Sequence, residues 1–183
     1  MKTRAEFGAW LTSCGYSRVA EIGVAAGVFS YHVLNNWTGG YTMIDPWSHQ
    51  SDGYVDVSNF TDDEHEQNYQ RALGVARHFA PRVQVLRSYS VEAAKTFPDS
   101  FFDVVYLDGN HSYEALLEDL HAWMPKVRSG GAMAGHDYLD GVLPQGIFGV
   151  KRAVQEFFGR TPDIVTDEDW PSWVMFNSRQ TTD

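Results

Sequence analysis

Three features are scarce in this sequence: cysteine, positive charge and long apolar runs. Cys14 is the only cysteine, which excludes an intrachain disulfide and a zinc site built from several cysteines. There are 14 lysines and arginines against 24 acidic residues, and the net charge of -10 argues against nucleic acid as a partner. No run approaches the roughly 20 apolar residues of a membrane-spanning helix, and the N-terminus lacks the apolar centre of a signal peptide. We therefore expect a cytoplasmic protein with no membrane partner, and whether it forms a homo-oligomer is open.

What the sequence does contain is a regular alternation of strand and helix patterns over 183 residues, a length typical of one domain. Apolar runs predict five strands, each followed by a helical pattern, at 18–22, 41–45, 83–86, 104–107 and 132–137. Such alternation is typical of a doubly wound parallel sheet. The last two runs, 163–166 and 173–177, are joined by an acidic turn without a helix, which predicts a hairpin with an antiparallel member. We predict an α/β protein, 1–183, with one domain: a Rossmann-like three-layer α/β/α sandwich around a seven-stranded, mostly parallel sheet.

Local signals predict several helix starts. Thr61 and Glu64 form a capping-box pattern, and Ser112 stands as N-cap before a run of apolar residues at helical spacing. Ser90 is expected to cap a helix that runs to residue 95. In the helix after Thr61, the acids and His65 of the first turns are expected to form a solvated face.

Several segments between these elements carry predictions of their own. Residues 1–16 predict an N-terminal helix that packs on the sheet or covers a binding site. The segment 46–60 is irregular and rich in rings, which could line a pocket or form the loop's own small core. The segment 123–131 should end a helix and turn, and 138–149 is predicted to be a glycine-rich loop. We treat 46–60 and 138–149 as candidate active-site loops and expect the last six residues to be frayed.

A glycine-rich turn follows the first strand in the pattern Glu21-x-Gly23-x-x-x-Gly27. Glycine permits unusual backbone angles and lets a ligand approach the main chain, and the following helix offers free N–H groups. The spacing is neither the G-x-G-x-x-G of dinucleotide enzymes nor a phosphate loop with its lysine. Glu21 suits a cationic or hydroxyl-bearing ligand better than a pyrophosphate. A glycine turn without a ligand is the structural alternative.

Asp45 ends the second strand about 20 residues beyond the glycine turn, where nucleotide-binding α/β folds place the carboxylate that binds ribose hydroxyls. A role in starting the Asp45-Pro46 turn is the alternative. Ser88 and Ser90 follow the third strand and could contact a bound base, although helix capping explains Ser90 equally well. Together these residues predict a nucleotide-like ligand at the carboxyl edge of the sheet.

Acids also end the fourth and fifth predicted strands. Asp108 stands with His111 on a tight strand-to-helix loop, and Asp137 ends the fifth strand. Neighbouring strands lie about 4.8 Å apart, so the two carboxylates should converge and repel unless a cation or a shared proton lies between them. His111, with an ordinary pKa of about 6.5, could accept a proton at neutral pH. The alternative is that these side chains only make hydrogen bonds within their loops.

The combined pattern resembles class I S-adenosylmethionine-dependent methyltransferases over nearly the whole chain. The segment from Glu21 to Gly27 is similar to the family's first motif, and Asp45 falls at its ribose-binding acid. The five strand–helix units and the terminal hairpin match the family's sheet. The resemblance implies S-adenosylmethionine as cofactor and gives binding roles to Glu21, Gly23, Gly27, Asp45, Ser88 and Ser90.

Three further segments resemble a narrower group, the macrocin-type and mycinamicin-type sugar O-methyltransferases, which use a divalent metal. These segments are Asp108-Gly-Asn-His-Ser-Tyr113, Arg128-Ser-Gly-Gly131 and Gly135-His-Asp-Tyr138. The resemblance implies that Asp108 and Asp137 hold magnesium and that His111 is the general base. The group's other strand-five acid is replaced here by His136, and imidazole suits zinc, iron or nickel better than magnesium.

We therefore expect a methyltransferase that modifies a small-molecule hydroxyl with the help of Mg²⁺ or another divalent metal. Asp108 and His111 would be catalytic, and Asp108, Asp137 and His136 would face the metal. Two alternatives stay open: a metal-independent methyltransferase on the same fold, and a cofactor-binding module without catalysis. The sequence does not identify the methyl acceptor.

Overall fold

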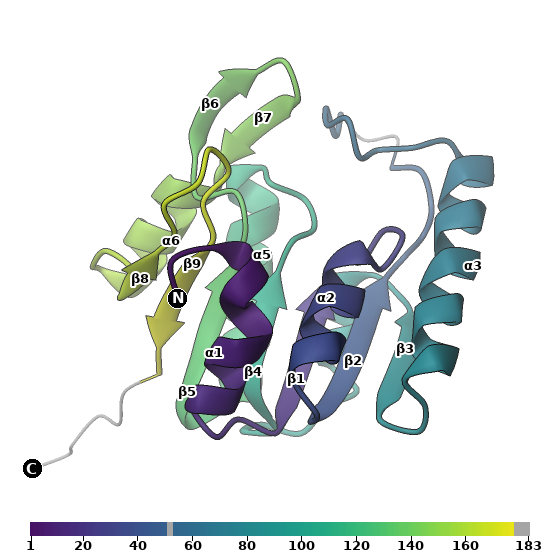
Figure 1. Ribbon diagram of the computed structural model, residues 1–183. Coiled ribbons are helices and arrows are strands. Elements are labelled where there is room, and N and C mark those ends of the chain that lie inside the picture. Colours follow the sequence, from purple (N-terminus) through teal and green to yellow (C-terminus); the bar gives the residue numbers. More distant parts are fainter. Residues whose placement is uncertain (51–52, 178–183) are drawn as a thin grey trace, which may run out of the picture.

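The computed structural model describes residues 1–50 and 53–177, which form a seven-stranded sheet with helices on both faces (Figure 1). The strands of this sheet are β1 (Arg18–Ile22), β2 (Gly40–Asp45), β3 (Val83–Arg87), β4 (Phe102–Leu107), β5 (Val127–Gly135), β8 (Ile164–Val165) and β9 (Trp173–Phe176). Their spatial order is β3-β2-β1-β4-β5-β9-β8. The predicted Rossmann-like fold is confirmed, and the end expected to be frayed lies outside the described residues.

Strand direction follows the prediction as well. The first five strands pair in parallel, whereas β9 runs antiparallel to both β5 and β8. Ile22 at the end of β1 stands opposite Leu107 of β4, and Leu107 stands opposite Gly135 of β5. The carboxyl ends of these strands therefore lie side by side. The strand order reverses between β1 and β4, and this is where open α/β sheets bind ligands.

The helices are α1 (Phe7–Ser13), α2 (Val28–Asn36), α3 (Asp62–His78), α4 (Ser90–Ala94), α5 (Tyr113–Trp123) and α6 (Val150–Phe158). The first three pack on one face of the sheet and the last three on the other (Figure 1). Every residue of β4 is buried, with Val104 and Tyr106 in one core and Val105 and Leu107 in the other. This two-sided burial explains why the strand is a continuous apolar run in the sequence.

Two of the three predicted N-caps are present. Thr61 and Glu64 form the reciprocal capping box of α3, and the Ser112 side chain caps α5. The prediction for Ser90 is wrong, because Ser90 is the first residue inside α4 and no side chain caps that helix. Its hydroxyl instead donates a hydrogen bond to Asp119 on α5. The buried Asp119 on a neighbouring helix therefore takes the hydroxyl that was expected to cap α4. This contact depends on tertiary packing and not on the local sequence.

Two segments predicted as connections are strands. Pro125 confines the end of α5 to one 3-10 turn, Met124–Lys126, so that residues 127–131 form the first half of β5 instead of a turn. Because β5 ends at Gly135, Asp137 lies two residues beyond the strand. The predicted glycine-rich loop is a hairpin of β6 (Asp140–Leu143) and β7 (Gly146–Gly149). The two strands pair with each other in antiparallel orientation. The positive φ values within them fall on Gly141 and Gly146, which adopt such angles without steric cost.

The N-terminal segment packs on the sheet, which was one of the two alternatives predicted for it. A 3-10 turn, Arg4–Glu6, precedes α1, and Phe7 and Leu11 of α1 are fully buried in the core under it. In the described part of the chain, we find no helix with the length and apolar character needed to cross a bilayer. The side chain of Arg4 leaves this packed segment and reaches the carboxyl edge of the sheet.

Candidate functional site

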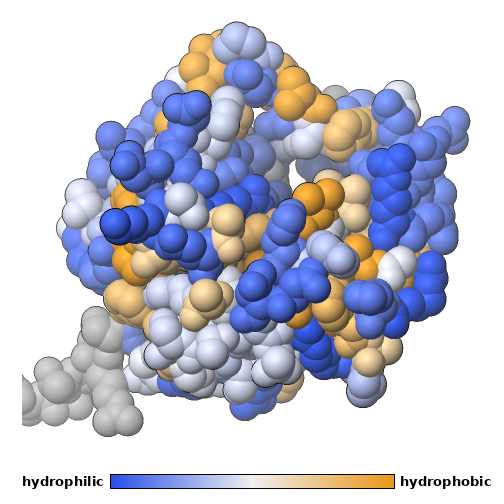
Figure 2. All heavy atoms as spheres, viewed as in Figure 1, coloured by the Kyte–Doolittle hydropathy of each residue, from blue (hydrophilic) through white to orange (hydrophobic). Residues whose placement is uncertain are grey.

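A cavity of about 910 Å³ opens at the carboxyl ends of β1, β2 and β4. Figure 2 shows this side of the molecule hollowed between the β6–β7 hairpin and the segment that precedes α3. Most of the residues that the sequence assigned to a cofactor line this cavity: Glu21, Gly23, Asp45, Ser88 and Ser90. The sixth, Gly27, lies outside the lining and makes the first turn of α2. The cavity therefore occupies the position that the fold reserves for ligands.

Close packing explains the two glycines of the turn. Gly23 has a φ of +85°, and a Cβ at this position would lie 2.0 Å from the carbonyl oxygen of Asp108. Gly27 has a φ of +77° and precedes α2 without any side-chain cap. Both conformations favour glycine, so the motif has a structural reason in addition to any ligand contact.

Glu21 is a buried acid at the floor of the cavity, with 1% of its surface exposed. Its carboxylate accepts hydrogen bonds from the hydroxyls of Ser30 and Tyr41. Burial raises the pKa of Glu21 to about 8, although both hydroxyls favour the charged form. A cationic ligand group nearby would restore the ionised carboxylate. The suitability of Glu21 for a cationic or hydroxyl-bearing ligand stays a prediction.

Asp45 folds back onto the glycine turn. Its Oδ2 accepts the backbone N–H groups of Val24 (2.8 Å) and Ala25 (3.0 Å), and its Oδ1 accepts that of Trp47 (2.7 Å). Three charge-assisted hydrogen bonds hold this carboxylate in one orientation. Asp45 therefore shapes both the glycine turn and the turn that begins at Pro46, and it also lines the cavity.

Ser88 and Ser90 lie where β3 leads into α4. The Ser88 hydroxyl donates to the carbonyl oxygen of Tyr89 (3.1 Å). The Ser90 hydroxyl donates to Asp119 and accepts from Trp123 Nε1 (2.8 Å). Ser90 is thus part of a hydrogen-bonded chain that joins α4 to α5, while Ser88 keeps only a local bond.

Asp119 is a buried acid at this end of the cavity that the sequence analysis did not select. It is 7% exposed, and burial raises its pKa to about 7 against the hydrogen bond from Ser90. It shares a stripe of α5 with Leu116, Leu120 and Trp123. An acid on an apolar helical stripe is the sequence signal that could have identified it.

The expectation of a solvated position for His65 is wrong. The side chain is 9% exposed and lines the cavity, and Nε2 is buried without a hydrogen-bond partner in the described residues. His65 shares the buried stripe of α3 with Asn68, Ala72 and Ala76. The loop segment before α3 covers this stripe, and that cover could not be foreseen from the local pattern of charges.

Asp108, His111 and Asp137 meet at the opposite end of the cavity from Ser90. One possible metal-ligating atom from each lies within 4.8 Å of the others. His111 Nε2 is 3.0 Å from Asp137 Oδ2 and 3.7 Å from Asp108 Oδ1. Asp137 has a φ of 52°, an uncommon conformation for a residue other than glycine and one that is typical of functional sites. The parallel pairing of β4 and β5 carries both acids to this point.

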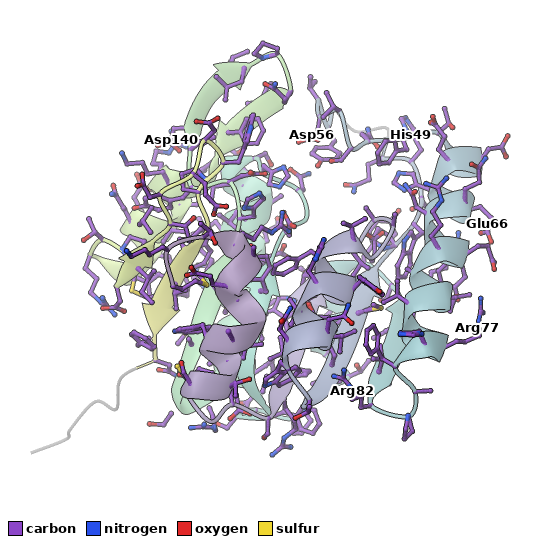
Figure 3. All side chains as sticks on the ribbon, viewed as in Figure 1. His49, Asp56, Glu66, Arg77, Arg82 and Asp140 are labelled. Atoms are coloured by element: carbon purple, nitrogen blue, oxygen red, sulfur yellow. The ribbon has the colours of Figure 1, made fainter. Side chains whose placement is uncertain are left out.

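Asp56 is a fourth member of this cluster and comes from the 46–60 segment, which Figure 3 shows above the sheet. Asp56 Oδ2 lies 2.9 Å from His111 Nδ1. Burial would lower the pKa of His111, but the carboxylates of Asp108, Asp56 and Asp137 raise it to about 10. With its carboxylates unneutralised, His111 therefore holds two protons at neutral pH and is not ready to accept another.

His136 lies beside the cluster and contacts Ser172 as well as Asp137. Its Nδ1 is 3.1 Å from the Ser172 hydroxyl, and its Nε2 is 3.4 Å from Asp137 Oδ1. Burial lowers the pKa of His136 to about 4, so that the ring is neutral. Within the described residues, the group whose ligand atoms converge contains Asp108, His111 and Asp137, and His136 is not part of it.

An arginine enters the cluster from the N-terminal segment. Arg4 forms an ion pair with Asp108, and its guanidinium lies 4.1 Å from the ring centroid of Phe29. Burial would raise the pKa of Asp108, but the charges of Arg4 and His111 hold it below its ordinary value. Arg4 and Asp108 are 104 residues apart, so no local spacing in the sequence could have indicated this pair.

Two loops form a roof over His111, and they are the two candidate active-site loops. The N–H of Ile147 in the hairpin donates to the carbonyl oxygen of Val55 (3.2 Å), and Phe148 stacks on the His111 ring with centroids 5.3 Å apart. A Cβ on Gly146 would lie 2.5 Å from the Val55 oxygen, so glycine permits this contact. The roof depends on contacts between segments about 90 residues apart in sequence.

The rings of the 46–60 segment serve both of the purposes left open by the sequence. Trp47 is 1% exposed and packs against Tyr69 with centroids 4.8 Å apart, so it forms a core for the loop. Tyr54 lines the cavity and also an adjoining pocket of about 620 Å³, in which His49 and Ile147 lie. This adjoining pocket is large enough for part of a second ligand next to the cluster.

Solved structures of other proteins share this fold. A putative caffeoyl-CoA O-methyltransferase from Staphylococcus aureus matches with a TM-score of 0.66 and 13% identity, over 94% of this chain and 82% of that one. The N-methyltransferase NodS from Bradyrhizobium japonicum matches with a TM-score of 0.64 and 12% identity, over 95% and 96%. Cofactor-bound Rv0187 from MTB matches with a TM-score of 0.62 and 19% identity, over 96% and 80%. At these identities the similarity shows the fold alone.

A curated relative and a family model give the sequence comparison. An uncharacterized protein of Sinorhizobium fredii, y4gI, is 28% identical over 86 residues, which are 44% of this chain. The chain spans only 10% of the length of that relative. The model of a family described as "Methyltransferase domain" matches residues 20–138, more than half of the chain, from β1 to just beyond Asp137. This protein therefore belongs to the methyltransferase domain family.

Proposed function

We propose that this protein is an S-adenosylmethionine-dependent O-methyltransferase that acts on a small-molecule hydroxyl with the help of a divalent metal ion. The observation that carries the proposal is the cavity itself, which joins the glycine turn to Asp108 and His111, with Asp137 in contact with His111. Membership of the methyltransferase domain family supports the reaction class. The likeness of the sequence to macrocin-type and mycinamicin-type enzymes supports the metal and the hydroxyl acceptor.

The residues around the cavity fit the cofactor in charge and size. S-adenosylmethionine carries a positive sulfonium and an α-amino group, and the buried Glu21 and Asp108 are acids placed to face them. Asp45 would contact the ribose, while the N–H groups of Val24 and Ala25 hold its carboxylate in place. Ser88, Ser90 and Asp119 would lie beside the adenine. The cofactor supplies an activated methyl group, so the protein's main task is positioning.

The donor set near His111 also fits a divalent metal. His111 Nε2 is buried and makes no hydrogen bond of good geometry in the described residues, although two carboxylates stand within 4 Å of it. Its Nδ1 is held by Asp56, which orients the ring with Nε2 toward the two carboxylates that would hold the metal. A metal held by Asp108 and Asp137 would bind acceptor oxygens and lower the pKa of the hydroxyl. His136 would act outside this set, from behind Asp137.

His111 would remove the proton from the acceptor hydroxyl. Its pKa of about 10 depends on the negative charges of Asp108, Asp56 and Asp137. Neutralisation of those carboxylates by a cation would lower this pKa toward the range in which imidazole accepts a proton at neutral pH. Phe148 and the roof would keep water from the reacting oxygen.

A metal-independent methyltransferase is the second candidate, and the ion pair of Arg4 favours it. Arg4 and the protonated His111 already place two positive charges beside Asp108, Asp137 and Asp56. In this case Asp137, whose pKa burial raises to about 6, would be the group that accepts the hydroxyl proton.

Methyl transfer from labelled S-adenosylmethionine to a panel of hydroxyl-bearing small molecules tests the proposal. We expect turnover with added Mg²⁺ or Mn²⁺ and a loss of at least about tenfold with excess chelator. The variant His111→Ala should lose about 10² to 10⁴ in kcat, the usual contribution of a general base. The matched control is His121→Ala, a histidine on the exposed side of α5.

Each outcome of this assay separates the candidates. Turnover that does not respond to chelator would support the metal-independent mechanism. Full turnover by His111→Ala would reject His111 as the base. Absence of methyl transfer together with tight binding of S-adenosylhomocysteine would indicate a cofactor-binding module.

A further inference from the structure

Arg4 lies where the glycine turn meets the carboxylate cluster. The backbone N–H of Arg4 donates to the side chain of Glu168 at 2.7 Å, which ties the N-terminal segment to the turn between β8 and β9. The guanidinium lies over the ring of Phe29, 4.1 Å from its centroid, and 5.6 Å from the centroid of Tyr106, which packs against Phe29. Its backbone and its side chain are therefore both held in place, and a cation is presented to the cavity in one orientation.

The guanidinium of Arg4 is only partly engaged by protein groups, and a quarter of the side chain surface is exposed. One Nη of Arg4 pairs with Asp108 Oδ2. Nε is buried and has no hydrogen-bond partner in the described residues. A guanidinium offers donors in a planar fork that matches a carboxylate, and a buried donor without a partner is costly. Nε itself is covered, but the exposed quarter of the Arg4 side chain lines the cavity and can donate to an acceptor there.

The charges around the cavity indicate what that acceptor is. Six acids line the cavity: Glu21, Asp45, Glu92, Asp108, Glu118 and Asp119. Among the described lining residues, Arg4 is the only lysine or arginine. An anionic group would be repelled along the acidic part of the wall and attracted by the charge of Arg4. Of the groups in S-adenosylmethionine, the α-carboxylate is the one with negative charge, and it lies at the end opposite to the adenine.

We propose that Arg4 binds the α-carboxylate of the cofactor with the part of its guanidinium that faces the cavity, while it keeps its ion pair with Asp108. This inference rests on the proposed function, because it assumes that the cofactor is S-adenosylmethionine. Arg4 then bridges the cofactor and the acid next to the acceptor. The N-terminal segment, which lies outside the part of the chain matched by the family model, becomes part of the cofactor site.

Two other roles for Arg4 must be distinguished from this one. Arg4 could serve only to neutralise Asp108 and to hold the N-terminal segment on the sheet. The carboxylate could instead be bound by the free N–H groups at the start of α2, which has no side-chain cap. Under both alternatives, replacement of Arg4 would change the affinity for a ligand with the α-carboxylate and for one without it by the same factor.

The test compares two ligands and two proteins by calorimetric titration. The ligands are S-adenosylhomocysteine and S-adenosyl-3-thiopropylamine, which has the same adenosine, thioether and amine but no carboxylate. The proteins are the wild type and Arg4→Gln, with Lys2→Gln as a matched control because Lys2 is an exposed cation of the same segment. Thermal unfolding of each variant verifies its fold.

We expect the wild type to bind S-adenosylhomocysteine about 10- to 100-fold more tightly than the decarboxylated analogue, the range for a charged hydrogen-bonded pair. Arg4→Gln should lose this preference by weakening the first ligand alone, and Lys2→Gln should keep it. If Arg4→Gln does not fold, Arg4→Lys serves in its place, since it keeps the charge and loses the planar fork. Its preference should fall by about threefold or more.

The outcomes separate the inference from the proposed function. A wild type that binds neither ligand removes both. A wild type that binds S-adenosylhomocysteine, with a preference that Arg4→Gln or Arg4→Lys leaves unchanged, overturns the role of Arg4 and leaves the proposed function intact. An equal loss for both ligands likewise assigns Arg4 to structure alone.

Discussion

The two ends of the cavity are built in different ways. The proposed cofactor end consists of Glu21, Gly23, Asp45, Ser88 and Ser90. The proposed reaction end consists of Asp108 and His111, which line the cavity, and of Asp56 and Asp137, which contact His111. At the cofactor end, Asp45 accepts three backbone N–H groups, so its position is fixed before any ligand arrives. At the reaction end, three carboxylates surround one imidazole, whose Nε2 has no good hydrogen bond in the described residues. The carboxylate of Asp45 thus has all its hydrogen-bond donors in place, whereas the carboxylates around His111 are arranged so that they could hold a cation.

This contrast explains how the fold divides its work. A satisfied hydrogen-bond network rigidifies a binding surface, whereas a cluster of like charges stores electrostatic energy that a ligand can release. We therefore expect changes at the cofactor end to alter binding and changes at the reaction end to alter kcat. The predictions below test that division, beginning with the largest expected effect.

Asp137→Asn should produce the largest loss of activity, about 10² to 10⁴ in kcat, because it removes a carboxylate from the group that faces the acceptor. Asparagine tolerates the positive φ of this position, so the fold should survive. The dissociation constant of S-adenosylhomocysteine should stay within about twofold of the wild type. Steady-state kinetics and calorimetry measure the two quantities, with the exposed Asp140→Asn as control. An unchanged kcat would exclude Asp137 from the reaction.

Asp45→Asn should act on binding. An amide cannot accept hydrogen bonds on both of its atoms, so either the glycine turn or the turn at Trp47 loses its anchor. We expect S-adenosylhomocysteine to bind about 10- to 100-fold more weakly, as expected for the loss of a charged hydrogen bond. The value of kcat at saturating cofactor should change much less. The control is Asp63→Asn, at an exposed acid of α3; a large fall in kcat with unchanged binding would contradict the division.

Asp56→Asn should have a smaller effect, a loss of about tenfold in kcat, the lower limit seen when the partner of a metal-binding histidine is changed. The reason is that Asp56 contacts His111 Nδ1 and is placed to orient the ring rather than to touch the acceptor. Asp56→Glu, which keeps the charge, should recover part of the loss. If Asp56→Asn were as damaging as His111→Ala, Asp56 would have a direct part in the chemistry.

Asp119→Asn should have the smallest effect on catalysis and should appear in stability instead. Burial raises the pKa of Asp119 to about 7, above its ordinary value, so its contribution to stability is present in acid and is lost as the pH rises toward 7. The amide keeps the oxygen that accepts from Ser90 and carries no charge. The variant should therefore gain on the wild type by on the order of 1 to 2 kcal/mol between pH 5 and pH 7.

Denaturant unfolding at several pH values measures this difference. Glu114→Gln, at an exposed acid at the start of the same helix, is the control. A difference between variant and wild type that does not depend on pH would mean that Asp119 is already ionised in the folded protein.

The contrast between the two ends also determines what the sequence could predict. The glycine turn and Asp45 belong to one strand–helix–strand unit, so their spacing along the chain records their proximity in space. Asp108 and Asp137 were also predictable to meet, since adjacent parallel strands end at the same edge. In these cases local patterns and sheet topology are sufficient.

The rest of the reaction end could not be predicted because it depends on packing between distant segments. Arg4 reaches Asp108 only because α1 packs on the sheet, and Asp56 reaches His111 only because its loop pairs with the β6–β7 hairpin. The error at Ser90 has the same origin, since Asp119 on another helix competes for its hydroxyl. Propensity and spacing describe neighbours along the chain and carry little information on such contacts.

Titration of S-adenosylhomocysteine into the wild type and into His111→Ala tests the central claim most directly. The account predicts a single site in both proteins, with a dissociation constant on the order of 1 to 100 μM, about -8 to -5 kcal/mol, that differs by less than about threefold between them. Loss of binding in His111→Ala would contradict the separation of the two ends. Absence of binding in the wild type would contradict the assignment of the cavity to this cofactor.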